Sequence, residues 1–344
     1  MRSNPRITRL AHPMAFRSFL DRMGEPTERL FRQQGLPVFC EDPSAFVPLS
    51  RAWSFFDAVV RRVDPMIGWQ VGRFVGDNSL NAKLLQKLEK APTLNLALGR
   101  LANLVRSEAS HLRLGTLRRG NDVLFFTKYP DVEEAPGYHV SQAYQLGVYI
   151  DLVRHFIGPG WIPAEMGVES SSVPIGLRDL FPGCRILSGQ RTGYIAVPRS
   201  HLHKQANRSD PGEADDSLVM TGRLDYVDTL VAMLRAYIPD GYPSARIAAG
   251  LMDTSERTLA RELSARDLTY GALIDEVRFK KSAEMLRETD ERMTDIGHAV
   301  GFDDPAHFAR MFVRIAGLSP REYRKRTQNS EPRTCAGGPM EPLP

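Results

Sequence analysis

Cysteine is scarce in this sequence, and no run of apolar residues is long. Cys40, Cys184 and Cys335 stand far apart and form no CxxC pair, so neither a disulfide framework nor a zinc site is expected. No stretch approaches the roughly 18 apolar residues that a membrane span requires, and the N-terminus lacks the apolar core of a secretory signal. We therefore expect a cytoplasmic protein in a reducing compartment, with no membrane partner.

Sequence motifs of catalysis are missing as well. The chain has no GxSxG, no HExxH and no Walker-type phosphate loop, which are the short signatures of common hydrolases and nucleotide-binding enzymes. His201 and His203 have the spacing of two metal ligands, but no nearby carboxylate or cysteine completes a site. We expect no enzyme activity, no metal and no cofactor.

Positive charge is concentrated in one short region. The 344 residues carry a net charge of +4, which by itself fits a nucleic-acid partner only weakly. From Gly241 to Ser330 there are 15 lysines and arginines and 14 aspartates and glutamates, so this part is not basic in bulk. Between Pro305 and Arg326, however, six basic residues accompany a single acid, Glu322. Such a local basic face is what a groove-binding element needs.

One pattern near the C-terminus occurs twice, 49 residues apart and without a gap, at residues 247–261 and 296–310. Apolar positions coincide in the two copies, and a helix-capping residue, Ser255 or Asp304, stands at the same place in each. Pro305 follows Asp304 at the first helical position, where its missing N–H costs nothing. This layout predicts two helix-turn-helix units, each with a second helix that can enter a DNA major groove.

The predicted second helices run from Ser255 to Leu263 and from Asp304 to Ile315, with apolar residues on one face and polar or small residues on the other. N-terminal turns of such helices contact base edges, and a guanidinium can bridge O6 and N7 of guanine. We predict DNA contacts from residues on the outward faces of both helices: Ser255, Glu256, Arg257, Ala260, Arg261, Pro305, Ala306, His307, Arg310 and Arg314.

An alternative remains open for each arginine taken singly. Glu256 and Glu262 lie close enough along the first helix to form ordinary surface ion pairs.

The second helix begins Pro305-Ala306, which predicts sparse base contact there. Arg310 would then contact a phosphate, and specificity would depend on the first helix.

The first 204 residues are predicted to be mixed α and β. Helical spacing of three and four occurs at residues 50–63, 80–106 and 140–157, and alternation with turn residues predicts a hairpin over 111–127 and a second strand pair over 184–197. The C-terminal part reads as helices only, at residues 224–238, 244–250, 255–263, 270–286, 294–300 and 304–315, with a short last helix.

Several C-terminal segments resemble the AraC/XylS family of bacterial transcription regulators, over about Leu224 to Arg324. They are Met252-Asp-Thr-Ser-Glu-Arg-Thr-Leu-Ala-Arg-Glu-Leu, Val277-Arg-Phe-Lys-Lys-Ser-Ala-Glu-Met-Leu, Ile296-Gly-His-Ala-Val-Gly-Phe-Asp-Asp, His307-Phe-Ala-Arg-Met-Phe and Gly317-Leu-Ser-Pro-Arg-Glu-Tyr-Arg. Arg32-Gln-Gln-Gly-Leu-Pro and Pro92-Thr-Leu-Asn-Leu-Ala-Leu resemble the arabinose-binding-type effector domain of one branch. The resemblance implies an activator that binds tandem half-sites in double-stranded DNA, contacts RNA polymerase and responds to a small-molecule effector.

The expected architecture has two domains. An α+β effector-binding and dimerisation domain, residues 1–204, precedes a linker, 205–217, an all-α DNA-binding domain with two helix-turn-helix motifs joined by a long helix, 218–326, and a disordered tail, 327–344. We expect a homodimer. Polar and aromatic residues on and after the helix at 140–157 are candidate effector contacts: Gln142, Tyr144, Gln145, Tyr149 and Trp161.

Two alternatives to an effector-controlled activator remain open at this stage. One is a repressor or architectural DNA binder whose N-terminal domain only forms oligomers. The other is an enzyme fused to a DNA-binding domain, although the sequence offers no set of nucleophile, base and orienting residue.

Overall fold

The chain divides into two compact units in a computed structural model that describes residues 5–73, 88, 90–110, 112–130, 135–205 and 225–328. Unit 1 comprises Met1–Asp240 and Ala248–Thr254, and unit 2 comprises Gly241–Ile247 and Ser255–Pro344. The predicted linker from residue 206 onward and the predicted tail from residue 329 onward lie outside the described residues. The predicted domain bounds therefore stay a prediction.

Unit 1 contains two sheets and several helices. Its elements are β1 (Ile7–Arg9), α1 (Ala11–Arg22), α2 (Thr27–Gln33), β2 (Phe46–Pro48), α3 (Leu49–Arg62), α4 (Ile67–Arg73), α6 (Leu94–Glu108), β3 (Arg113–Arg119), β4 (Asp122–Lys128), α7 (Tyr138–Ile157), β5 (Glu165–Gly167), α8 (Leu177–Leu180), β6 (Arg185–Leu187), β7 (Gly193–Pro198), the 3₁₀ turn η1 (Arg199–His201), α9 (Tyr226–Tyr237) and the 3₁₀ turn η2 (Ile238–Asp240). The predicted α+β class of this region is confirmed.

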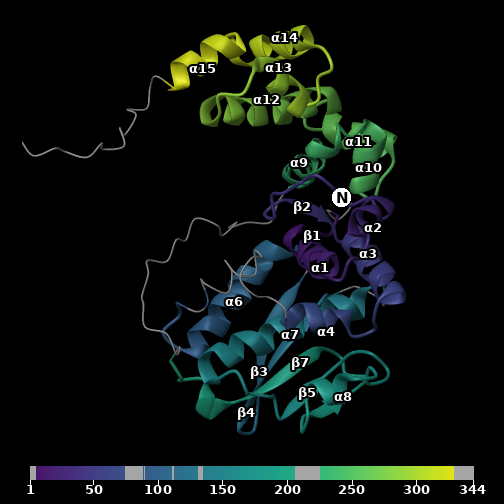
Figure 1. The fold of residues 1–344 in the computed structure, drawn as a ribbon, viewed down its shortest axis with the longest axis vertical. Coiled ribbons are helices and arrows are strands. Elements are labelled where there is room, and N and C mark those ends of the chain that lie inside the picture. Colours follow the sequence, from purple (N-terminus) through teal and green to yellow (C-terminus); the bar gives the residue numbers. More distant parts are fainter. Residues whose placement is uncertain are drawn as a thin grey trace, which may run out of the picture. The chain divides into compact units, whose positions relative to one another are not determined.

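The larger sheet has the strand order β3-β4-β7-β5-β6, and α7 packs against β4 and β7 (Figure 1). Alternate residues of β4 face opposite sides, as the pleat requires. Phe125 is fully buried and meets the Tyr149 ring of α7 edge-on, with ring centroids 5.5 Å apart. Leu124 packs with Tyr194 and Ala196 in a separate small cluster. The β3–β4 hairpin predicted from sequence is present.

The second predicted strand pair is wrong in its pairing. Both strands exist, as β6 and β7, but β5 lies between them, antiparallel to β7 and parallel to β6. Turn residues between two short apolar runs favoured a local hairpin, whereas β6 pairs with the three-residue strand β5 and β7 lies between β4 and β5. Local sequence patterns do not report such non-local pairing.

Helices α4 and α7 approach each other unusually closely. A Cβ atom on Gly72 would lie 2.6 Å from the Tyr144 carbonyl oxygen, and one on Gly68 would lie 2.5 Å from the Val140 carbonyl oxygen. Gly147 of α7 faces Gly72, because a Cβ placed on it would lie 3.0 Å from the Gly72 Cα atom. The three glycines therefore let the two backbones touch, and no larger residue fits without displacing a helix.

Strand β2 connects the smaller sheet of unit 1 with α9, against which it packs. The Asp240 carboxylate, at the end of the 3₁₀ turn η2 that follows α9, accepts hydrogen bonds from the backbone N–H groups of Val38 and Phe39, at 2.6 and 2.7 Å. The Tyr237 hydroxyl donates to the Gly35 carbonyl oxygen at 2.8 Å. Helix α9 is thereby fixed to the loop that precedes β2.

The C-terminal region is helical throughout its described residues. It comprises α10 (Ala245–Leu251), α11 (Glu256–Ser264), α12 (Tyr270–Glu288), α13 (Met293–Ala299), α14 (Pro305–Ala316) and α15 (Pro320–Gln328). These bounds agree with the predicted helices to within one or two residues. The predicted all-α class, with two helix-turn-helix motifs joined by the long helix α12, is confirmed.

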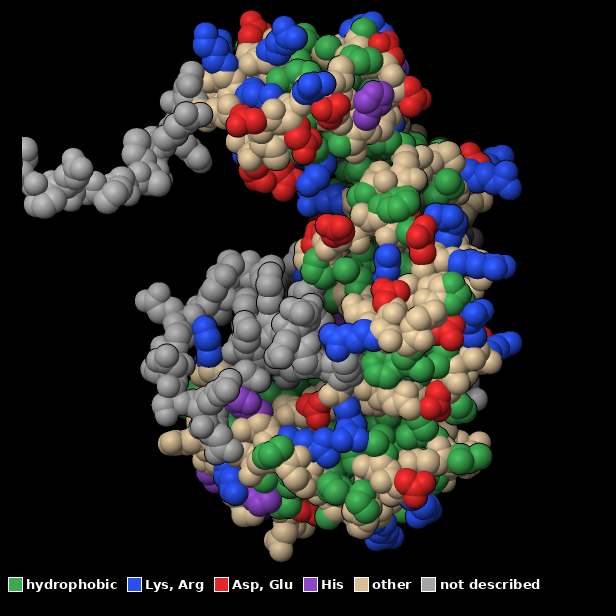
Figure 2. Space-filling view, in the orientation of Figure 1, with side chains coloured by type: hydrophobic (Ala, Val, Ile, Leu, Met, Phe, Trp, Pro, Cys, Tyr) green, Lys and Arg blue, Asp and Glu red, His purple; other side chains and the backbone are tan. Residues whose placement is uncertain are grey.

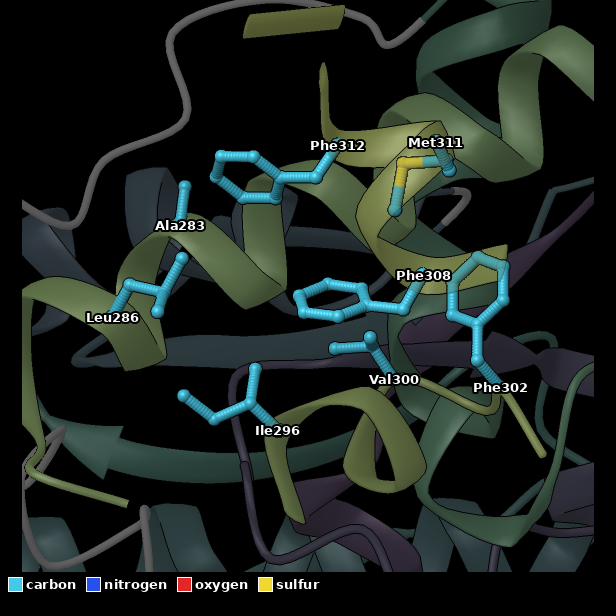
Figure 3. Close-up of a cluster of buried hydrophobic side chains, with 8 residues drawn as sticks. All are labelled: Ala283, Leu286, Ile296, Val300, Phe302, Phe308, Met311 and Phe312. Atoms are coloured by element: carbon cyan, nitrogen blue, oxygen red, sulfur yellow. The ribbon is translucent and has the colours of Figure 1, made fainter. Parts of the chain in front are cut away.

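A compact apolar core holds α12, α13 and α14 together (Figure 3). Its buried members come from the three helices and from the turn between α13 and α14: Ala283, Leu286, Ile296, Val300, Phe302, Phe308, Met311 and Phe312. Phe308 and Phe312, predicted from sequence to face inward, are 1% and 0% exposed. The opposite face of α14 is thereby left to solvent.

Candidate nucleic-acid interface

The first predicted recognition helix, α11, begins at a side-chain cap. The Ser255 hydroxyl accepts a hydrogen bond from the Thr258 backbone N–H at 3.2 Å, which satisfies a donor that the helix itself cannot. Leu259 and Leu263 are buried, at 1% and 0% exposure. The cap and the apolar stripe predicted from sequence are confirmed, and the rest of the first turn faces solvent.

The second predicted recognition helix, α14, starts in an equivalent way. The Asp304 carboxylate accepts a hydrogen bond from the Ala306 backbone N–H at 2.9 Å, and Pro305 occupies the first turn. Gly301 shapes the preceding turn with φ of +74°, a conformation that L side chains rarely adopt. Gly317 ends the helix with φ of +69°.

All ten residues predicted to contact DNA are exposed on α11 and α14. Within the part of the chain that the structure describes, Arg257 forms no ion pair. Arg261 lies 3.6 Å from Glu262, and Arg310 lies 3.9 Å from Asp304, with both arginine side chains more than two-thirds exposed. Ion pairs at such exposure contribute little, so these guanidinium groups can exchange their carboxylates for a nucleic acid.

Arg314 differs from the other predicted contact residues. Its guanidinium bonds to the Asp275 carboxylate of α12, which is 23% exposed. The Arg261 and Arg310 pairs lie within one helix or at its cap, whereas this pair joins the C-terminal half of α14 to α12. Arg314 therefore braces α14 against α12.

Charge on the helical region is interspersed rather than uniform. In the view of Figure 2, lysine and arginine side chains alternate with aspartate and glutamate over these helices. The basic residues of α15 extend the local positive region seen in the sequence, although the Arg324 guanidinium donates to the Glu291 carbonyl oxygen at 2.7 Å. Phosphate contacts would come from individual side chains, not from one broad positive field.

A small cavity lies in unit 1 among α1, α3, α6 and α7, with a volume of about 40 Å³. Apolar side chains and ring edges form most of its wall, and Thr8, His12, Glu108, Tyr129, Ser141, Tyr144, Gln145 and Tyr149 contribute its polar groups. Of the predicted effector contacts, Tyr144, Gln145 and Tyr149 line this cavity. The Gln142 side chain instead accepts from the Glu169 backbone N–H at 3.1 Å, and Trp161 is not part of the lining.

Sequence reasoning missed the charged end of this cavity. His12 Nε2 lies 3.5 Å from one Glu108 oxygen, and Arg9 Nε lies 3.9 Å from the other. Burial, with a further contribution from the Arg9 cation, lowers the pKa of His12 to about 4, so His12 is neutral at pH 7. Burial raises the pKa of Glu108, while Arg9 opposes that rise.

The Tyr149 hydroxyl is the least satisfied polar group at the cavity. It is buried and makes no hydrogen bond of good geometry within the described residues. Thr127, which interacts with it, donates its own hydroxyl to Gln145 Oε1 at 2.8 Å. Because the Thr127 hydroxyl oxygen can accept from the Tyr149 hydroxyl, the Tyr149 oxygen is the atom at the cavity wall to which a ligand or a water can donate.

Neither a metal cluster nor a spanning helix is found in the described residues. No group of three or more histidine, cysteine, aspartate or glutamate side chains there could hold a metal ion. None of the helices described is long and apolar enough to cross a membrane.

Comparison with known proteins supports the helix-turn-helix assignment. Residues 248–326 match the family model described as "Helix-turn-helix domain". The ornithine utilization regulator of Pseudomonas aeruginosa is 27% identical over 141 residues, which are 38% of this chain and 41% of that protein. The transcriptional activator RhaS of an Enterobacter species is 35% identical over 106 residues, 30% of this chain and 38% of that protein.

Among solved structures, the transcriptional regulator CdpR from Pseudomonas aeruginosa matches 79% of this chain and 90% of its own, with a TM-score of 0.38 and 18% identity. The present chain spans about two-fifths of the length of the two curated relatives named above. Their names describe one as a utilization regulator and the other as a transcriptional activator. The C-terminal region therefore contains a helix-turn-helix domain, and the two curated relatives that it resembles are named as regulators.

Proposed function

We propose that this chain regulates transcription by binding specific double-stranded DNA sequences with α11 and α14. One observation carries the proposal: both helices begin at a side-chain cap and leave their first turns exposed, within the region that matches the helix-turn-helix model. The first turn of such a helix reaches base edges when the helix lies in the major groove. The ten exposed residues predicted from sequence are the proposed DNA contacts.

The two helices are proposed to make different kinds of contact, α11 mainly with bases and α14 mainly with phosphates. On α11, Arg257 and Arg261 stand beside the small Ala260, which allows close approach to the bases. On α14, the short side chains of Pro305 and Ala306 reach few base edges, and Arg310 contacts a phosphate. Phosphate contacts fix register and orientation, whereas base contacts carry sequence information. Specificity would therefore depend mainly on α11.

A footprint tests this proposal directly. Duplexes enriched by the full chain from a random library are cleaved by hydroxyl radicals with and without protein. Two protected segments, with centres about 10 base pairs apart, are expected if α11 and α14 occupy successive major grooves. A single protected segment, or protection that does not depend on sequence, would contradict the proposal.

We further propose that a small-molecule effector controls this activity by binding at the cavity of unit 1. Ligand pockets usually measure about 300–1,000 Å³, whereas this cavity measures about 40 Å³. An effector must therefore open it, and a ligand that favours the open form shifts the population of states. Leu49, which lines the cavity, directly follows β2, and β2 packs on α9. Opening the cavity would thus disturb the support of the helix that precedes the first helix-turn-helix unit.

The remaining parts of the proposal are activation, contact with RNA polymerase and assembly into a homodimer. Activation is supported by relatives named as transcriptional activators. Polymerase contact and dimerisation follow from the family resemblance alone.

The Tyr149 hydroxyl provides a test of the effector site. Compounds that raise the thermal midpoint of the full chain are titrated calorimetrically against the wild type and Tyr149→Phe. Loss of one ligand hydrogen bond is expected to weaken binding by about 1 kcal/mol, roughly fivefold. Tyr194→Phe is the control, because its hydroxyl bonds to Glu165 at 2.7 Å and does not line the cavity. Equal dissociation constants for Tyr149→Phe and the wild type with every binding compound would count against this site.

A further inference from the structure

Arg278 of α12 lies against two aromatic rings that belong to different helix-turn-helix units. Its guanidinium carbon is 3.7 Å from the centre of the Tyr242 ring and 4.5 Å from the centre of the Phe302 ring. The side chain is only 18% exposed, and its Nη1 atom lies 3.6 Å from the Asp275 carboxylate. A planar cation over ring faces is attracted by their electron density, and the attraction increases when water is excluded.

Tyr242 and Phe302 lie at different places in the two helix-turn-helix motifs. Tyr242 lies in the segment that leads into α10, the first helix of the first unit, and Phe302 lies in the turn between α13 and α14 of the second unit. Gly301 allows the two junctions to meet, because a Cβ on this residue would lie 1.7 Å from the Tyr242 ring. The side chain of Arg278 therefore joins the segment before α10 to the turn between α13 and α14.

Two further contacts strengthen the same junction within unit 2. The Tyr270 hydroxyl, at the start of α12, donates to the Pro243 carbonyl oxygen. Asp275, one turn before Arg278, bonds to Arg314 of α14. Helix α12 thus contacts the segment before α10, the turn between α13 and α14, and α14 itself.

We propose that Arg278 is a positioning residue that sets the spacing and angle at which α11 and α14 are presented to DNA. The proposal rests on the proposed function, since it requires both helices to bind one duplex. Arginine suits this role better than lysine, because its flat guanidinium stacks on rings while it keeps an ion pair at its edge. Arg278 itself touches no DNA in this proposal.

The test compares the full chain with Arg278→Met and Arg278→Lys on duplexes enriched by the wild type. Each duplex is used intact, with either half-site scrambled, and with one or two base pairs inserted between the half-sites. Lys280→Met is the matched control, because Lys280 is an exposed cation on the same helix.

Arg278→Met is expected to bind duplexes with a single half-site with the affinity of the wild type, but to bind the intact duplex about tenfold more weakly. It should also bind duplexes with inserted base pairs that the wild type rejects, because the two linked binding events no longer share a fixed geometry. Arg278→Lys should recover part of the loss. Equal losses on single and intact duplexes, or no loss at all, would overturn the proposal. Tyr242→Leu, read out in the same way, serves if Arg278→Met does not fold by circular dichroism.

If the wild type binds duplexes with one and with two half-sites with equal affinity, the proposed function itself would be contradicted. If the second half-site raises the affinity of the wild type and of Arg278→Met by the same factor, only the role of Arg278 would be contradicted.

Discussion

Arg261→Ala is expected to weaken binding to the preferred duplex by about 1–3 kcal/mol and to relax the preference at one or two base pairs. Arg261 lies one turn into α11 on its exposed face, and its ion pair with Glu262, at 3.6 Å, is solvent-exposed. Little stability is therefore lost in the free protein, whereas a bidentate contact with guanine is lost in the complex. Affinity is measured by fluorescence anisotropy on duplexes in which each base pair is varied in turn.

Two other arginines give this prediction its contrast. Arg310→Ala is expected to weaken binding to all sequences by a similar factor and to reduce the salt dependence by about one phosphate contact. Arg287→Ala removes an exposed cation of α12, which is neither of the two recognition helices, and should change affinity little. If Arg261→Ala behaves like Arg287→Ala, the assignment of α11 as the base-reading helix is wrong.

Gly72→Ala is expected to destabilise unit 1 by about 1–3 kcal/mol, because the added methyl group forces α4 away from α7. The new Cβ would lie 2.6 Å from the Tyr144 carbonyl oxygen, a backbone atom that cannot turn aside. Tyr144 also lines the cavity, so the displacement should alter effector binding as well. Chemical denaturation of the full chain measures the change.

Gly99→Ala is the matched control. Gly99 lies in α6, is exposed, and a Cβ on it would meet no atom within 4 Å. Alanine in an exposed helix is favoured over glycine by about 0.5–1 kcal/mol, so this variant should be slightly more stable than the wild type. Equal effects of the two substitutions would show that the helices can move apart without cost.

Much of the helical region could be predicted from the sequence because its signals are local. A cap at Ser255 or Asp304, a proline behind the second cap and apolar residues four apart each act within one or two turns. The β3–β4 hairpin and α7 were predictable for the same reason. Strands β1 and β2 were not predicted, since each has three residues and their pairing joins Thr8 to Val47.

The parts of the site that were missed depend on contacts between distant segments. His12 and Tyr144 are 132 residues apart in sequence, yet His12 Nδ1 lies 3.4 Å from the Tyr144 hydroxyl. No local spacing reports that approach. The local sequence does not distinguish Arg278 from other charged residues of α12, and only the fold places the rings of Tyr242 and Phe302 beside it.

The most direct test of the central claim is the affinity of the full chain for its enriched duplex and for a scrambled duplex of the same composition, each at two salt concentrations. The enriched duplex is expected to bind at least about 10³-fold more tightly, and salt should weaken both complexes with the slope of several phosphate contacts. Equal affinities for the two duplexes would contradict sequence-specific binding by α11 and α14.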